Sequence, residues 1–405
     1  MYDVIVVGAR CAGSATALLL ARRGYRVLLV DRATFPSDTI SGHFIMHPGV
    51  IRLQRWGLLD KVLASGCPPI TKFSSNFGDF TLSGQAPEEL DGLPFAVGPR
   101  RTVLDTILVE AAAEAGAEVR QGFNVTDVLW RGRHVIGIRG GSQNGTVAEE
   151  RAQLVIGADG KRSKIAQLVR APVYRESPSL TCWYMSYWSN FPCEGLDINW
   201  RHRRIVFTFP TNDGLTFQGV TWAHQDFHEF RQNIEQNYLD TLTMMPDLAE
   251  RLPDARRESQ FYAMADLPGF FRKPYGPGWA LVGDAGHHKD PVPAHGITDA
   301  FYDAELLADS IHRGLAGEQP LEDALTDYEK SRNARAIPDY EDTCQRARLE
   351  GWDAPEVLAL RAALRGNKED TSQFYAVMAR AIPREAFFVP ENLQRIMRLT
   401  ANPIS

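Results

Sequence analysis

The amino-acid sequence predicts an α/β fold in which a parallel sheet alternates with helices and a second sheet is inserted between its parts. Three segments predict the parallel sheet, because in each an apolar run leads into a glycine-containing turn and then a helix. Between about residues 173 and 270, aromatic and polar side chains alternate, as they do in strands with one buried face. The residues after Asp309 have mostly helical periodicity.

The composition is that of a globular chain with one or two domains. Of the 405 residues, 44% are hydrophobic, which is enough to bury a large core. The formal net charge of −6 gives neither the basic surface of a nucleic-acid-binding protein nor a cationic face for a membrane. No stretch is long and apolar enough to span a bilayer, and no secretory signal precedes Tyr2. The five cysteines lack metal-binding or disulfide spacing, so we expect a reduced, cytoplasmic protein.

The first 31 residues predict a nucleotide-binding strand–helix–strand unit. The expected strands and the helix between them lie at Val4–Val7, Val27–Val30 and Ala12–Arg23. Gly8 and Gly13 permit the tight turn and close packing of a dinucleotide-binding loop, and Asp31 stands where an acid binds ribose hydroxyls. Arg10 replaces the middle glycine of that pattern and could reach a phosphate with its guanidinium. Alone, this unit leaves FAD and NAD as alternatives.

The third segment, residues 279–309, is the one around which we expect the chain to be organised. An apolar strand precedes the turn Gly283-Asp284, Pro291 holds the following residues extended, and helical periodicity begins at Ile297. Gly296 then lies at a helix N-terminus, where unpaired N–H groups and the helix dipole favour an anion. An ordinary strand–turn–helix with a turn aspartate would show the same pattern.

Together the segments resemble the flavin motifs of the single-component aromatic hydroxylases of the p-hydroxybenzoate hydroxylase type, in a superfamily that includes the geranylgeranyl reductases. In the third motif of that family, Gly-Asp leads to a Pro, a Gly-x-Gly loop and a helix with Asp-Ala. Here the loop reads Ala294-His295-Gly296, so one glycine is replaced. The resemblance implies that Asp284 bonds the ribityl chain, and that amides near Gly296 face N1 and O2 of the isoalloxazine.

The resemblance also implies that FAD is the cofactor and points to further residues that hold it. The second segment, Leu154–Ser163, matches the family's Asp-Gly motif for FAD and the nicotinamide nucleotide: Asp159 can accept from a ribityl or ribose hydroxyl, and Gly160 keeps the turn open. Arg101 matches a FAD-contacting arginine of the family, with Arg100 as a close competitor. The expected cofactor-binding residues are Gly8, Arg10, Cys11, Ala12, Gly13, Asp31, Arg32, Arg101, Val125, Asp159, Gly160, Asp284, Pro291, Ala294, Gly296 and Ile297; no metal ligand is expected.

The inserted sheet predicts a ligand-binding surface. Its strands are expected at Thr181–Phe191, Arg204–Pro210 and Leu215–Trp222, with a hairpin turn at Asn212-Asp213-Gly214. An aromatic-lined sheet suits an apolar or aromatic ligand, with plain sheet packing as the alternative. We expect Tyr184, Tyr187 and Phe207 to line a pocket.

Two histidines in the turn-rich loop Phe35–Gly49 are candidates for catalysis. In the resembling hydroxylases this region lies near the flavin and the substrate, so His43 or His47 could bond a substrate oxygen or act as a base. A surface loop with incidental histidines is the alternative. The candidate catalytic residues are therefore His43, His47, Tyr184 and Tyr187.

The resemblance divides the chain into three parts. A discontinuous Rossmann-like FAD-binding domain takes residues 1–69, 94–173 and 272–309, a substrate-binding β-sheet domain takes 70–93 and 174–271, and a helical region takes 310–405. Helices are expected at Val50–Leu63, Phe227–Leu248, Tyr328–Arg348 and Pro355–Leu364.

The implied activity is that of a FAD-dependent monooxygenase, acting as a monomer or homodimer. It would use NAD(P)H and O₂ to hydroxylate or epoxidise a small, largely apolar or aromatic molecule through a flavin C4a-hydroperoxide. The alternative is a FAD-dependent reductase of the geranylgeranyl type acting on carbon–carbon double bonds, since Phe207-Thr208-Phe209-Pro210 resembles a strand of that class. A flavin-dependent halogenase is less favoured, because both tryptophans of its Trp-x-Trp-x-Ile-Pro strand are missing and Lys72 is typical of a solvated strand end. A flavin-binding sensor or carrier without turnover is a third class.

Overall fold

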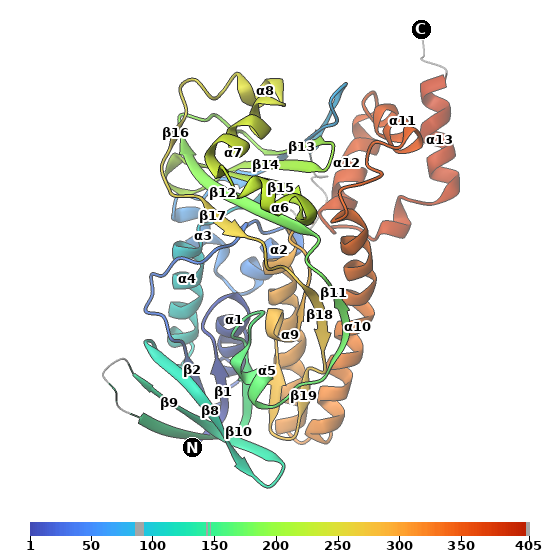
Figure 1. Ribbon diagram of the computed structural model, residues 1–405. Coiled ribbons are helices and arrows are strands. Elements are labelled where there is room, and N and C mark those ends of the chain that lie inside the picture. The colour runs from blue at the N-terminus through green and yellow to red at the C-terminus, as the bar shows by residue number, and fades with distance from the viewer. Residues whose placement is uncertain (86–92, 143–144, 146, 402–405) are drawn as a thin grey trace. The chain divides into compact units, whose positions relative to one another are not determined.

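The computed structural model describes residues 1–85, 93–142, 145 and 147–401, and it confirms the predicted α/β class (Figure 1). The chain forms two compact units. Unit 1 comprises Met1–Ser41, Arg100–Pro178 and Pro268–Cys344, and unit 2 comprises Gly42–Pro99, Ser179–Leu267 and Gln345–Ser405. Residues 42–69 and the end of the chain belong to the same unit as the inserted sheet. The boundaries of the two units therefore differ from those of the three predicted domains, and the domain division stays a prediction.

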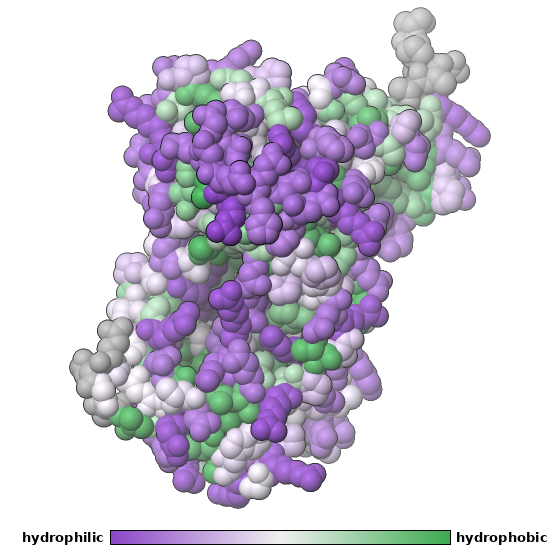
Figure 2. Space-filling model, viewed as in Figure 1, coloured by the Kyte–Doolittle hydropathy of each residue, from purple (hydrophilic) through white to green (hydrophobic). Residues whose placement is uncertain are grey.

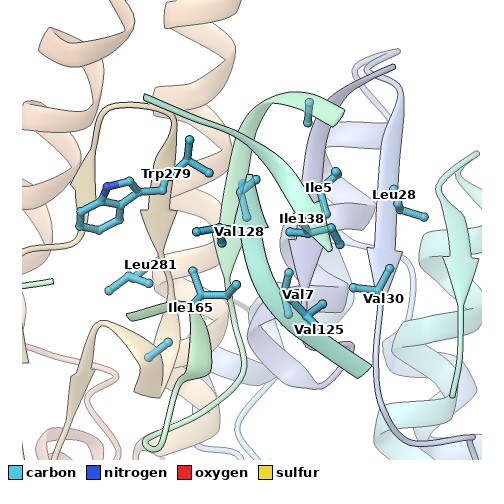
Figure 3. Close-up of a cluster of buried hydrophobic side chains, with 14 of the residues drawn as sticks. Ile5, Val7, Leu28, Val30, Val125, Val128, Ile138, Ile165, Trp279 and Leu281 are labelled. Atoms are coloured by element: carbon cyan, nitrogen blue, oxygen red, sulfur yellow. The ribbon is translucent and has the colours of Figure 1, made fainter. Parts of the chain in front are cut away.

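A parallel sheet lies at the centre of unit 1, in the order β20-β10-β1-β2-β7, with β19 antiparallel at the β20 edge. Its strands are β1 (Tyr2–Val7), β2 (Val27–Val30), β7 (Glu118–Arg120), β10 (Val147–Gly157), β19 (Tyr275–Gly276) and β20 (Trp279–Leu281). Side chains of these strands are gathered in one buried cluster with Val125, Val128 and Ile138 (Figure 3). The strands expected from the first and third segments are confirmed, because continuous apolar runs mark strands buried on both faces.

The helices and smaller sheets of unit 1 complete its layers. Helix α1 (Cys11–Ala21), buried along almost its whole length, packs against α4 (Arg101–Glu114) and α9 (Gly296–Leu315). The remaining helices are α5 (Lys164–Leu168) and α10 (Leu321–Arg346). Strands β8 (Phe123–Arg131) and β9 (His134–Ser142) pair with the first half of β10. A three-stranded sheet consists of β11 (Val173–Ser177), β18 (Gly269–Arg272) and β21 (His287–His288).

The main sheet of unit 2 has the order β16-β12-β15-β14-β13-β4-β5, with β17 also paired to β12. Its strands are β4 (Lys72–Asn76), β5 (Thr81–Gln85), β12 (Thr181–Ser189), β13 (Leu196–Arg201), β14 (Arg204–Pro210), β15 (Thr216–Ala223), β16 (Arg256–Arg257) and β17 (Tyr262–Met264); a separate pair is β3 (Pro69–Ile70) with β6 (Ala96–Val97). The predicted turn between β14 and β15 is confirmed: Asp213 and Gly214 have φ values of 63° and 66°, which Asp and Gly tolerate.

Two segments of unit 2 were each predicted to be one continuous helix, and both predictions are wrong. Val50–Leu63 is divided into α2 (His47–Arg55) and α3 (Leu59–Ala64), because Gly57 has a left-handed φ of 71°. Phe227–Leu248 is divided into α6 (Phe227–Phe230), α7 (Ile234–Thr243) and α8 (Pro246–Ala249). Asn233 caps α7 by accepting from the Gln236 amide, and Pro246 begins α8, so both residues start new helices. Helix α11 (Pro355–Leu364) is as predicted, followed by α12 (Lys368–Met378) and α13 (Pro390–Ala401).

No helix among the described residues is long and apolar enough to cross a membrane. Hydrophilic residues dominate the face of the molecule in Figure 2, where hydrophobic residues occupy small, separate areas.

Candidate active site

The turns of the three motif segments follow the carboxyl ends of neighbouring parallel strands in unit 1. Gly8 follows β1, Asp31 follows β2, Asp159 comes shortly after β10, and Gly283-Asp284 comes shortly after β20. In open α/β sheets, ligands bind at this edge, because the loops and helix N-termini converge there. The sheet therefore brings the three motif segments to one place.

The glycines of these segments hold the turns in contact. A Cβ at Gly8, whose φ is 107°, would lie 2.5 Å from the Ala158 carbonyl oxygen. A Cβ at Gly13 would lie 1.8 Å from the Gly8 carbonyl oxygen, and one at Gly283 would lie 2.8 Å from the Ala12 Cβ. The first turn of α1 thus touches both other segments, and a side chain at these glycines would separate them.

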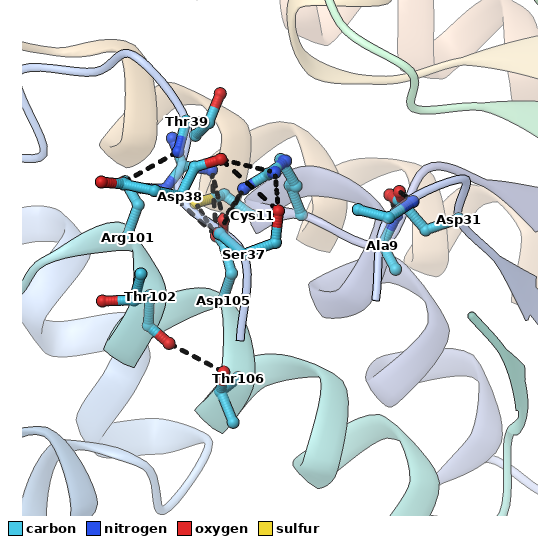
Figure 4. A network of polar contacts seen from close by, with 12 residues as sticks. Ala9, Cys11, Asp31, Ser37, Asp38, Thr39, Arg101, Thr102, Asp105 and Thr106 are labelled. Carbon is cyan, nitrogen blue, oxygen red and sulfur yellow. Dashed lines mark hydrogen bonds and ion pairs between the residues drawn. The ribbon is translucent and has the colours of Figure 1, made fainter. Parts of the chain in front are cut away.

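Asp31 is fixed at the end of β2 by two main-chain amides (Figure 4). Its Oδ2 accepts from the Ala9 amide at 2.7 Å, and its Oδ1 accepts from the Ala33 amide at 2.7 Å. A carboxylate oxygen can accept a second hydrogen bond, so the ribose hydroxyls expected at this position remain compatible with both contacts. Arg32, the next predicted cofactor residue, is exposed.

A buried cluster of two arginines and one aspartate lies beside α1. Arg10 Nη1 donates to Asp105 Oδ2 at 2.5 Å, and the guanidinium also donates hydrogen bonds to Ser37 and to the Asp38 carbonyl. Arg101 Nε and Nη2 bond the same carboxylate at 2.9–3.1 Å (Figure 4). The cluster carries one positive charge in excess, since two guanidinium groups share one carboxylate. Sequence reasoning missed Asp105, although its position four residues after Arg101 is the spacing of a helical ion pair.

Cys11 lies next to this cluster and is a buried thiol. The Cys11 Sγ lies 3.5 Å from Asp105 Oδ1, and burial raises the pKa of its thiol to about 12. Cys11 is therefore a neutral thiol at ordinary pH and a packing residue at the start of α1. A direct contact of Arg10, Arg101 or Cys11 with a phosphate stays a prediction.

Asp159 acts as the N-terminal anchor of α5. Its carboxylate accepts from Ser163 Oγ at 2.5 Å and from the Lys164 and Ile165 amides at 2.6 and 3.1 Å. Burial raises the pKa of this carboxyl group, while the hydrogen bonds oppose the rise. Gly160 has a φ of 80°, which explains the glycine in the turn. Because the Asp159 carboxylate already has these partners, its predicted contact with a sugar hydroxyl is a further, untested one.

The third segment has the geometry that an anion site requires. Helix α9 begins at Gly296, which is exposed, and a Cβ added there would meet no atom within 4 Å. Asp284 is likewise exposed. Ala294 has a left-handed φ of 55°, so the family's glycine at this position is explained by the backbone. Open space at a helix N-terminus is compatible with the edge of a flavin ring, and a contact of the flavin with this end of α9 stays a prediction.

The remaining predicted cofactor residues are less open. Val125 is buried in the cluster of Figure 3, so its side chain belongs to the core and only its main chain could contact a cofactor. Ile297 is buried in the first turn of α9, and Pro291 is half-buried.

The two faces of the unit 2 sheet have different neighbours. One face packs against α6–α8 and carries Tyr184, whose ring is stacked on Phe230 at a centroid distance of 4.5 Å. Side chains alternate along a strand, so Tyr187 points to the opposite face. Tyr184 therefore packs between the sheet and its helices, on the opposite face from Tyr187. A catalytic role for Tyr184 or Tyr187 stays a prediction.

The opposite face of the sheet carries a group of aromatic rings around His43. The His43 ring stacks on Tyr187 at 5.6 Å and meets the edges of Phe209 and Phe217 at 5.3 and 4.9 Å. Phe207 lies on the same face, two residues before Phe209, and its ring centroid is 5.3 Å from that of Trp183. We call this set the aromatic face: His43, Trp183, Tyr187, Phe207, Phe209 and Phe217. Sequence reasoning missed Phe209 and Phe217, which the period of two along β14 and across its partner β15 could have identified.

The hydrogen bonding of His43 defines its tautomer. Its Nδ1 lies 3.1 Å from the Gly98 carbonyl oxygen, which can only accept, so Nδ1 carries the proton. The same carbonyl accepts from Thr211 Oγ1 at 2.6 Å and is thereby fixed. In the neutral ring, Nε2 is then the basic nitrogen. His43 is 1% exposed and has a φ of 31°, a conformation that side-chain-bearing residues rarely adopt and that is often found at functional sites.

Two further residues weighed in the sequence also belong to unit 2. His47 is the first residue of α2 and is buried. Lys72, weighed as a halogenating lysine, is an exposed residue paired with Glu194.

Comparison with known proteins decides the family. The model of the FAD binding domain family matches residues 1–338, which is more than half of the chain. The chain belongs to this family. FAD is therefore its cofactor, and the match supports the p-hydroxybenzoate hydroxylase-type superfamily.

Proteins that resemble this chain in sequence or in fold have names that indicate different reactions. A digeranylgeranylglycerophospholipid reductase of Methanosarcina mazei is 27% identical over 344 residues, covering 81% of this chain and 80% of that protein. A monooxygenase of Aspergillus candidus is 26% identical over 376 residues, covering 83% and 88%. The structure of a myxobacterial chondrochloren halogenase superposes with a TM-score of 0.78 at 23% identity, covering 98% and 97%, which shows a shared fold. This protein is thus a FAD-dependent oxidoreductase by family, with relatives in three reaction classes.

The adenosine half of FAD provides the first test of the site. Replacing Asp31 with alanine should weaken FAD binding by tenfold or more, since a hydrogen bond to a charged group is worth about 1.5–3 kcal/mol. Titrating FAD into apoprotein and following flavin fluorescence measures the loss. Asp309→Ala, which removes an exposed aspartate of the same unit, should leave the affinity unchanged. FMN lacks the adenosine half, so equal losses for FAD and FMN would contradict the placement of Asp31.

Proposed function

We propose that this protein is a monooxygenase that uses NAD(P)H and O₂ to hydroxylate or epoxidise a small, largely apolar or aromatic molecule. When bound and reduced, FAD supplies the electrons and the activation of oxygen. The residues of the chain then have three tasks: to bind the flavin, to orient the substrate and to keep water away from it.

The aromatic face is the observation that carries this proposal. Its rings are all at least nine-tenths buried, and they offer flat apolar surfaces of the kind that aromatic ligands stack on. The basic nitrogen of His43 lies among them, held by the Gly98 carbonyl through Nδ1. A ligand that combines a ring with one polar oxygen matches this surface better than a purely aliphatic chain. An aliphatic chain has no group that could form a hydrogen bond with the histidine nitrogen.

His43 would act on a substrate hydroxyl in this arrangement. Its Nε2 can accept a hydrogen bond or a proton from that hydroxyl, which makes the attached ring more electron-rich and easier to oxidise. The proton would reside on Nε2, while the Gly98 carbonyl continues to accept from Nδ1 and so stabilises the imidazolium. The surrounding rings lower the local polarity and strengthen both interactions.

A reductase of the geranylgeranyl type is the second candidate. It is supported by the similarity to the Methanosarcina reductase and by the Phe207–Pro210 segment of β14. Such an enzyme would transfer the electrons of reduced FAD to a carbon–carbon double bond and would not need O₂.

Oxygen dependence separates the two candidates. Phenolic and other neutral aromatic compounds, screened with NADH and with NADPH, should accelerate cofactor oxidation by the FAD-loaded protein and give product only when O₂ is present. The same screen under anaerobic conditions, with FAD reduced by dithionite and an isoprenoid as substrate, tests the alternative. Undiminished product formation without O₂ would replace the monooxygenase proposal with the reductase one.

A further inference from the structure

A buried ionic network joins the loop before α9 to the helices α9 and α10 of unit 1. Lys289 Nζ lies 2.7 Å from Asp299 Oδ2 and also bonds Asp339. Arg335 bonds Asp299 at 2.5 Å and Asp303 at 2.7 Å. Asp299 and Asp303 belong to α9, whereas Arg335 and Asp339 belong to α10. Lys289 is the one member of this network that comes from the loop.

The network is enclosed by protein. The side chains of Lys289 and Asp299 are 7% and 6% exposed, and that of Asp303 is not exposed at all. Buried charges are costly unless they are paired, and removing one partner leaves the other uncompensated. Two histidines lie at its edge: His287 Nδ1 is 3.2 Å from Asp303, and His295 Nδ1 is 3.7 Å from Asp339.

The negative charge of Asp299 lies at the N-terminal end of α9. It lies in the first turn of α9, three residues after Gly296, where a carboxylate stabilises the helix dipole. The same negative charge would oppose an anionic ligand at that helix end, whose partial positive charge is only about half a unit. Arg335 hydrogen-bonds the Asp299 carboxylate and Lys289 forms an ion pair with it, so both cations offset part of its charge, although Lys289 is shared with Asp339 and Arg335 with Asp303.

We propose that Lys289 is a positioning residue that keeps the N-terminal end of α9 positive and thereby favours the reduced, anionic form of the bound flavin. Lys289 acts through Asp299 and does not itself touch the cofactor. The proposal rests on the placement of the flavin edge at Gly296, and it holds for a monooxygenase and a reductase alike.

Variants of opposite charge make the proposal testable. Lys289→Met removes a positive charge and should lower the affinity ratio of reduced to oxidised FAD by about tenfold, equivalent to a fall of about 30 mV in the two-electron midpoint potential. Asp339→Asn removes a negative charge from the other side of Lys289 and should raise the potential. The double variant restores the charge balance and should return the potential towards that of the unmodified protein.

The measurement is a redox titration of the flavin absorbance, made without substrate and at low ionic strength. Lys273→Met is the matched control, because Lys273 is a half-exposed lysine of the same unit, 3.8 Å from Glu329, and its loss should leave the potential unchanged. Lys289→Arg keeps the charge and should behave like the unmodified protein. Circular dichroism of the apoproteins checks that each variant is folded.

The sign of the shifts decides the outcome. Opposite shifts in the single variants and recovery in the double variant support the proposal. Shifts in the same direction, additive losses in the double variant, or unchanged potentials in folded variants overturn it and leave Lys289 as a structural residue. Failure of the unmodified protein to bind FAD would instead remove the flavin site itself, so the two failures are distinguishable.

Discussion

Replacing His43 with asparagine is expected to lower turnover of the accepted substrate by about 10²–10⁴-fold, the usual contribution of general acid–base catalysis. Asparagine tolerates the left-handed backbone of this position and keeps a donor for the Gly98 carbonyl, so the fold should be preserved. It cannot, however, take up a proton. FAD affinity should remain unchanged, because none of the predicted flavin-binding residues is altered.

Steady-state turnover and flavin reduction by NAD(P)H are the two measurements for this variant. His202→Asn is the control, since His202 is an exposed histidine of the same unit. His47→Asn tests the other candidate histidine. Full activity of His43→Asn together with a loss in His47→Asn would move the catalytic role to His47, and full activity of both would remove histidine from the mechanism.

Replacing Gly296 with valine should weaken FAD binding by about 5–30-fold and lower the flavin midpoint potential. The loss corresponds to about 1–2 kcal/mol, the worth of a partly buried anion at a helix N-terminus. The protein itself has room for the new side chain, since a Cβ at Gly296 meets no atom within 4 Å and its φ is not in the left-handed region. The loss should therefore appear in cofactor binding and leave the stability of the apoprotein nearly unchanged.

A matched substitution makes this result specific. Gly366→Val adds the same side chain at another exposed glycine with open space around it, in unit 2. Comparing FAD affinity, midpoint potential and thermal unfolding of the two apoproteins separates a cofactor effect from a general one. If Gly296→Val binds and reduces FAD as the unmodified protein does, the flavin edge lies elsewhere than at the start of α9.

Much of the fold follows from local sequence patterns. Continuous apolar runs located β1, β2 and β20, and alternation located β12, β14 and β15, because these periods reflect burial on two faces or one. Helix boundaries inside polar stretches did not follow, since Gly57 and Asn233 act through backbone conformation and capping that helical periodicity does not express.

Only part of the candidate site could be predicted from the sequence. Motif residues such as Gly8 and Gly296 could be named from the pattern of the motifs; at Gly8 the left-handed φ and the close Ala158 carbonyl explain the glycine. The ion-pair partner of Arg10 could not be predicted, because Asp105 is 95 residues away in the chain. The face on which Tyr184 lies, and the pairing of Lys289 with Asp339, likewise depend on how distant segments pack.

The most direct test of the proposed activity is the origin of the oxygen in the product. A single turnover of FAD-loaded, NAD(P)H-reduced protein with an accepted aromatic substrate under ¹⁸O₂, followed by mass spectrometry, measures it. The account predicts a product two mass units heavier than the one formed under ¹⁶O₂, with no label acquired from H₂¹⁸O. A product without oxygen from O₂, or a saturated product formed equally well under argon, would contradict it.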